Sequence, residues 1–230
     1  MRRLATILLL SIPMSAAAHD LWLEKEAGAY VLFQGHRHSS HAGASVVPYE
    51  PGAVKSALCR EADGSVKAIA PSKSHPIRLN GECTALVVSF STGYWTKTAW
   101  ETTNAPRTGI SGVLKSWLSE DSVKRIDLWT SANAQPLGKG LEITPLSDPG
   151  KTAIDDKLVV LVTENKKARA GVPVAYSGST RGTTGEDGKI AIRLRRDGLQ
   201  LISASIEAPL SDGKADTVIR ATALQFELPK

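Results

Sequence analysis

Short apolar and β-branched runs, separated by turn-forming residues, dominate the hydrophobic pattern of this chain. Turn signals such as Glu186-Asp187-Gly188 divide the second half into five such runs, at 158–162, 172–176, 190–194, 199–206 and 222–228. Short strands at this spacing, bounded by glycine and aspartate, are typical of antiparallel β-sandwiches. We therefore expect an immunoglobulin-like or transthyretin-like β-sandwich over residues 141–230.

The first half is also rich in strand-like runs, but their spacing is irregular. The residues from Tyr30 to Phe33 and from Thr84 to Phe90 predict strands, and Asp20 to Leu23 is expected to pair with the first of them as a hairpin. After Pro106, apolar positions recur at helical spacing at Val113, Leu114, Trp117 and Leu118, which predicts a helix.

Glycine and proline gather between residues 136 and 149, and we place the boundary between two domains there. The expected organisation is an irregular, β-rich domain over residues 19–140 followed by the sandwich over residues 141–230. The fold class predicted from the pattern is mainly β.

The first 18 residues carry the pattern of a secretory signal. Two arginines precede a short apolar run from Leu4 to Met14, and Ala16-Ala17-Ala18 forms a small-residue cleavage site. This run is too short to cross a bilayer about 30 Å thick, and no later run is longer. We expect cleavage after Ala18 and a periplasmic protein that is not embedded in the membrane.

Composition excludes several classes of function. The net charge is +5 and the charged residues are scattered, so a nucleic-acid surface is not expected. We find no nucleophile elbow, no zinc-protease motif and no phosphate-binding glycine loop, and we do not expect an enzyme on these grounds.

The chain has two cysteines, Cys59 and Cys83. In an oxidising compartment such a pair is most simply a disulfide, worth roughly 3 kcal/mol for a loop of this size. A pair of metal thiolates is the alternative, but the spacing lacks a close C-x-x-C arrangement.

Four of the five histidines lie near the start of the exported chain: His19, His36, His38 and His41. Cleavage after Ala18 makes His19 the first residue, which offers both its α-amine and its ring Nδ1 to one metal ion. The pKa of an α-amine is about 7.7–8.0, low enough for a metal to displace its proton near neutral pH.

The expected hairpin would bring His19 close to His36 and His38, which share one face if the second strand continues. His41 is then an optional further ligand. Imidazole nitrogens suit zinc, copper, nickel and iron, whereas calcium and magnesium prefer oxygen. The alternative interpretation is a solvated loop. His75 is isolated and is expected to be structural or exposed.

Other side chains near these histidines could assist a metal site. Asp20, Glu24, Glu26 and Gln34 are candidate oxygen ligands, or partners that orient a ring. All five tryptophans fall in the first half, where they are expected mainly to fill a core. The functional alternative is an aromatic wall around a ligand pocket at Tyr94 and Trp95.

A family resemblance covers nearly the whole exported chain. The resemblance rests on these segments: His19-Asp20-Leu21-Trp22-Leu23-Glu24, Gln34-Gly35-His36, residues 140–146 with Asp148-Pro149, residues 170–174, residues 184–190 and residues 221–228. With these segments the chain resembles periplasmic proteins associated with nickel uptake or cobalt transport. The resemblance implies a two-part β protein linked to transition-metal uptake, and it carries His19 and His36 over as metal-site positions.

These observations lead to one main hypothesis, a periplasmic protein that captures a divalent ion and delivers it to a membrane transporter. Lys97 and Arg107 could neutralise an acidic chelator at the Tyr94 and Trp95 pocket, so a binding module for a metal chelate remains an alternative. A copper enzyme that uses His19 in an N-terminal histidine brace is the other alternative.

Overall fold

The computed structural model describes residues 20–35, 37 and 46–228, and this part of the protein is mainly β, as predicted. Its first eight strands are β1 (Asp20–Glu26), β2 (Ala29–Gly35), β3 (Val54–Arg60), β4 (Val66–Ala68), β5 (Arg78–Asn80), β6 (Ala85–Lys97), β7 (Thr102–Thr103) and β8 (Lys115–Ile126). The other eight are β9 (Leu141–Pro145), β10 (Lys157–Glu164), β11 (Lys167–Ala168), β12 (Pro173–Tyr176), β13 (Ser179–Thr183), β14 (Lys189–Arg193), β15 (Gly198–Pro209) and β16 (Thr217–Leu228).

Within the described residues, the helices are three short 3-10 helices: η1 (Pro51–Ala53), η2 (Ser131–Ala134) and η3 (Pro149–Lys151). No helix in the described part of the chain has the length and apolar character needed to cross a membrane.

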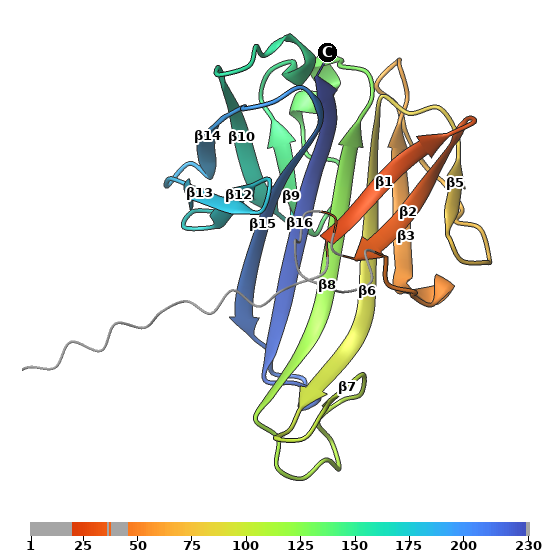
Figure 1. Ribbon diagram of the computed structural model, residues 1–230, viewed down its shortest axis with the longest axis vertical. Helices are drawn as coiled ribbons and strands as arrows, with labels where there is room; N and C mark the ends of the chain where they lie inside the picture. The colour runs from red at the N-terminus through yellow and green to blue at the C-terminus, as the bar shows by residue number, and fades with distance from the viewer. Residues whose placement is uncertain (1–19, 36, 38–45, 229–230) are drawn as a thin grey trace, which may run out of the picture.

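The strands form three sheets (Figure 1). The largest has nine strands in the order β13-β12-β15-β16-β8-β6-β3-β4, with β7 paired to β6. A three-stranded sheet has the order β1-β2-β5, and a four-stranded sheet has β10 at its centre, paired with β9, β11 and β14.

Two cores lie on opposite faces of the large sheet. Neighbouring residues of one strand point to opposite faces, and in β16 Ala223 joins one hydrophobic cluster whereas Leu224 joins the other. The first cluster is shared with the β1-β2-β5 sheet through residues such as Leu23 and Leu32. The second is shared with β9 and β10 through residues such as Ile143. The packing is therefore that of stacked sheets with the largest in the middle.

Strands from both halves of the sequence build this middle sheet. β16 pairs in parallel with β8, from Thr217 opposite Trp117 to Phe226 opposite Ile126. The boundary predicted at residue 140 therefore lies between segments that share one sheet.

The helix predicted after Pro106 is wrong. Residues from Lys115 onward form β8, which pairs with β6 on one side and with β16 on the other. Trp117 and Leu118, which helical spacing would place on one face, are neighbours in a strand and point to opposite faces. Pairing along both edges of β8 outweighs the local helical pattern.

The predicted disulfide is confirmed, because Cys59 and Cys83 are bonded. The bond joins β3 to the segment that leads into β6, and both cysteines are buried in the first core. The predicted hairpin of β1 and β2 is also confirmed. Its two-residue turn needs positive φ, which Ala27 and Gly28 adopt at 41° and 81°.

Candidate functional site

The end of the β1-β2 hairpin brings three points of the chain together. Asp20, the first residue of β1, lies opposite Gly35, the last residue of β2. Gly35 also forms an antiparallel bridge with Val46, and the Val47 amide donates a hydrogen bond of 2.7 Å to the carbonyl of Gln34. The residues on either side of segment 36–45 are therefore held beside the start of β1.

Side chains of the large sheet fix this hairpin through Leu23. The Leu23 amide donates to Gln225 Oε1 at 2.8 Å, and the Leu23 carbonyl accepts from Arg125 Nη1 at 3.1 Å. Arg125 is itself held by Asp127 at 2.7 Å and by Glu227 at 3.0 Å. These contacts hold the hairpin in one position on the sheet.

Asp127 extends the same network towards β2. The Tyr30 hydroxyl donates to Asp127 Oδ2 at 2.8 Å. Burial, helped by the neighbouring Asp127 charge, raises the pKa of Tyr30 to about 12, so that this hydroxyl keeps its proton. Burial alone would raise the pKa of Asp127, but the charge of Arg125 and the hydrogen bonds from Arg125, Tyr30 and Lys25 hold that pKa below its usual value. Asp127 is therefore an anionic anchor at neutral pH.

The other face of the hairpin carries an aromatic and ionic cluster. The rings of Trp22 and Phe33 stack with centroids 5.5 Å apart. The Arg37 guanidinium lies 5.6 Å from the centroid of Trp22 and pairs with Glu24 at 2.9 Å, while Trp22 Nε1 also donates to Glu24. Glu24 is thus engaged by Arg37, and Glu26 is engaged by Arg78 at 3.0 Å.

The predicted metal ligands His19, His36, His38 and His41 lie outside the described residues. Within residues 20–35, 37 and 46–228, the structure holds no group of three or more histidine, cysteine or acidic side chains placed to bind one metal ion. His75 is exposed, and its ring meets Tyr49 edge-on with centroids 4.7 Å apart.

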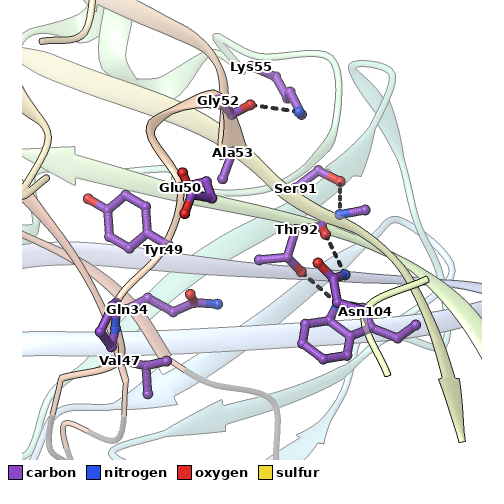
Figure 2. Close-up of a pocket in the computed structure, with 13 residues that line it drawn as sticks. Gln34, Val47, Tyr49, Glu50, Gly52, Ala53, Lys55, Ser91, Thr92 and Asn104 are labelled. Carbon is purple, nitrogen blue, oxygen red and sulfur yellow. Dashed lines mark hydrogen bonds between the residues drawn. The ribbon is translucent and has the colours of Figure 1, made fainter. Parts of the chain in front are cut away.

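A cleft of about 470 Å³ lies between the end of this hairpin and the large sheet (Figure 2). Small-molecule sites commonly have volumes of about 300–1,000 Å³. Its walls come from the end of β2, from the segment leading into β3 and from a bulge in β6, and its polar side chains are Gln34, Glu50, Lys55, Ser91, Thr92 and Asn104.

Hydrogen bonds within the cleft hold several of these groups in place. Asn104 donates to the backbone carbonyls of Thr92 and Tyr94 at 2.9 and 2.8 Å. Trp95 Nε1 donates to Thr92 Oγ1 at 2.9 Å, and Lys55 Nζ donates to the Gly52 carbonyl at 2.8 Å. Asn104 was not a candidate from the sequence, because no pattern along the chain links it to β6.

The two aromatic residues predicted to line a pocket have different surroundings. Trp95 lines the cleft and stacks on Trp117, with ring centroids 6.4 Å apart. Tyr94 instead donates its hydroxyl to Asp212 at 2.6 Å and carries Lys214 over its ring. Arg107 pairs with Asp216, and Lys55 is the cationic side chain among the described residues that line the cleft.

A second cleft of about 220 Å³ contains Asp121, whose chemistry the sequence did not reveal. Burial raises the pKa of Asp121 to about 6, opposed by a hydrogen bond from Ser119 and assisted by the charge of Glu120. Arg220 pairs with Glu120 at 2.7 Å and with Glu164 at 3.3 Å. Asp121 is therefore a carboxyl group that exchanges protons close to neutral pH.

Comparison with known proteins identifies the family. Residues 16–208 match the family described as a domain of unknown function (DUF4198). This match covers most of the chain, and the chain belongs to that family. Among curated proteins, none matches it.

Proposed function

We propose that this member of the DUF4198 family is a periplasmic protein that binds a divalent transition metal and delivers it to a membrane transporter. Nickel, cobalt and copper are the candidate ions, with zinc as a further one. The observation that carries the proposal is the register of the hairpin, in which Asp20 faces Gly35 and Gly35 bridges Val46.

This register limits the distance between the candidate ligands, because they are covalently bonded to the paired residues. His19 is bonded to Asp20, and His36 is bonded to Gly35. Opposed residues in an antiparallel pair have Cα atoms about 4.5–5.5 Å apart, and each further residue adds at most about 3.8 Å. Both imidazoles therefore start within reach of one ion.

The bridge between Gly35 and Val46 limits the position of His38 and His41 through chain length alone. These residues belong to the ten-residue stretch of sequence, 36–45, between the two bridged residues. His38 is three residues from Gly35, and His41 is five residues from Val46. An extended chain spans at most about 3.6 Å per residue, so chain length limits His38 to about 11 Å from Gly35 and His41 to about 18 Å from Val46.

The chemistry of these ligands supports a transition metal. Imidazoles and an α-amine favour nickel, cobalt, copper and zinc over magnesium and calcium. Glu24 is engaged by Arg37. Asp20, opposite Gly35, is a carboxylate at the hairpin end and a candidate oxygen ligand beside the nitrogen donors. The disulfide between Cys59 and Cys83 is compatible with an oxidising compartment.

The cleft beside the hairpin favours a second candidate function, the binding of a metal chelate. Gln34 and Val47 belong both to the hairpin end and to the cleft, so an organic ligand bound there would lie next to the metal ligands. Trp95 supplies an aromatic surface and Lys55 a cation for a carboxylate. Quenching of tryptophan fluorescence by nickel citrate, but not by nickel alone, would support this function.

Calorimetric titration of protein that begins at His19 tests the main proposal. We expect one nickel, cobalt or copper ion to bind at micromolar concentration or tighter. His36→Ala and His38→Ala should each lower the affinity at least about tenfold, since each removes one ligand. His75→Ala is the matched control, because this exposed histidine meets Tyr49 edge-on and is not one of the proposed ligands. Absence of micromolar binding for nickel, cobalt, copper and zinc would refute the proposal.

A further inference from the structure

The two most exposed large apolar side chains of the described residues lie at one tip of the molecule. Trp100 is 94% exposed and Leu114 is 67% exposed. They belong to the segments that join β6, β7 and β8 at the end of the long strands, on the side opposite the C-terminal end of β16 (Figure 1). A tryptophan exposed to this extent needs an explanation, because its large ring usually packs against other side chains.

Hydrogen bonds hold the turn that presents Trp100. The Thr98 amide donates to the Glu101 carbonyl at 2.9 Å, and Thr98 Oγ1 accepts from the amides of Trp100 and Glu101 at 3.2 and 3.3 Å. Just beyond this turn, β7 pairs back onto β6. The exposed ring therefore projects from an ordered turn.

The second apolar residue is held to the same tip. The Leu114 amide donates to the Lys97 carbonyl at 2.8 Å, and Lys97 pairs with Lys115 where β6 meets β8. The segment between β7 and β8 is tied to the body as well, since Thr96 Oγ1 donates to the Ala105 carbonyl at 2.8 Å. Trp100 and Leu114 thus belong to one ordered projection, residues 97–115, which we call the finger.

We infer that this finger docks the protein reversibly on a lipid bilayer by inserting Trp100 and Leu114 among the headgroups. Tryptophan favours the boundary between hydrocarbon and water, because its ring is largely apolar and its indole N–H is polar. The hydroxyls of Thr98 and Thr102 and the ammonium of Lys97 flank the ring along the chain and suit the headgroup layer.

The size of the tip favours a bilayer over a protein partner. A stable protein interface buries about 800 Å² on each partner. A tryptophan buries about 150–250 Å², so this ring with one leucine supplies well under that area. A bilayer accepts a narrow convex tip, because lipids rearrange around it.

Charge adds modestly to this docking. The segment 97–115 contains Lys97, Arg107 and Lys115 against one acidic residue, Glu101. This excess suits anionic lipids, but Arg107 pairs with Asp216 and Lys115 pairs with Glu207 at 3.0 Å. Apolar insertion therefore dominates, and docking should persist at high salt.

Co-sedimentation with vesicles of phosphatidylcholine and phosphatidylglycerol tests the inference, using metal-free protein. Bound protein should show a blue shift of tryptophan emission. Trp100→Ala should lower the partition coefficient at least about tenfold, as expected when one large apolar side chain no longer leaves water. Leu128→Ala is the matched control, because Leu128 is 61% exposed but lies just after β8, at its other end, and it should bind like the unmodified protein.

Three outcomes would overturn the inference. These are no association with the vesicles, equal association of the Trp100→Ala variant, and Trp100-dependent association only with membranes that contain proteins. The last outcome would assign the finger to a protein partner. Because no metal is present, none of these outcomes bears on the proposed metal site.

Discussion

One alanine added ahead of His19 is expected to lower the affinity for nickel(II) or copper(II) about a hundredfold. The extension converts the α-amine of His19 into an amide, which no longer offers a basic nitrogen beside the ring. A second donor on the same residue acts at a high effective concentration, and such linkage commonly adds about 10²–10⁴ to affinity. A hundredfold loss corresponds to about 2.7 kcal/mol of binding free energy.

The comparison needs two proteins that differ only at this end, one beginning at Ala18 and one at His19. Their affinities are measured by competition with a chelator of known strength. Both metal-free proteins should unfold at the same temperature, because the hairpin is held by Leu23, Gln225 and Arg125 rather than by the terminus. Equal metal affinities would show that the α-amine is not a ligand.

Replacing Glu142 by glutamine is expected to lower the free energy of unfolding by about 3–5 kcal/mol, as when one partner of a buried ion pair is removed. Glu142 binds Lys124 Nζ at 2.8 Å, and the side chains of both residues are at most 2% exposed. Glu142 also accepts hydrogen bonds from the amides of Leu137 and Gly138 at 2.6–3.0 Å. The variant leaves the Lys124 ammonium buried without a counter-charge, beside β9.

The pH dependence of this variant identifies the cause. Burial already lowers the pKa of Lys124, while the charge of Glu142 opposes that shift. Without Glu142, the pKa of Lys124 in the folded protein should fall further below its unfolded value of about 10.4. Folding then releases a proton, so stability falls as pH drops and the deficit of the variant narrows as pH rises towards 10.

Denaturant unfolding at pH 7 and pH 9.5 measures both effects. Glu207→Gln is the matched control, because Glu207 pairs with Lys115 at 3.0 Å while both side chains are about 40% exposed. Exposed pairs contribute about 0–1 kcal/mol. A loss below about 1 kcal/mol for Glu142→Gln would contradict the importance of the buried pair.

The sequence was most informative where local pattern and covalent chemistry agree with the tertiary fold. The runs around Tyr30 and Leu86 form strands, and the cysteine pair forms a disulfide. Both predictions rest on short apolar runs and an even cysteine count, which can be recognised without knowing the distant partners. The helix prediction failed at Trp117, where pairing with β6 and β16 outweighs the helical spacing of apolar residues. The parallel pairing of β8 with β16 joins residues about a hundred positions apart and leaves no local signal.

The sequence predicted the hairpin beside the candidate site, but not the surroundings of the individual side chains. The pairing of Asp20 to Leu23 with the second strand was expected because the two strand-like runs are close in the sequence, and the structure supplies its register. The separate surroundings of Tyr94 and Trp95 depend on a bulge between Phe90 and Gly93, which composition does not reveal. Asp121 lies in a charged run that resembles ordinary surface, and its burial by other strands is the main cause of its raised pKa.

Anomalous diffraction at the metal edge would test the central claim most directly, using crystals of the protein that begins at His19 grown with one equivalent of nickel(II) or copper(II). We predict a single strong peak beside Asp20 and Gly35, with the α-amine and ring nitrogen of His19 at about 2.0–2.1 Å, the usual distance for nitrogen ligands. At least one of the His36 and His38 rings should complete the site. A peak elsewhere, or one bound only by carboxylates and water, would contradict the account.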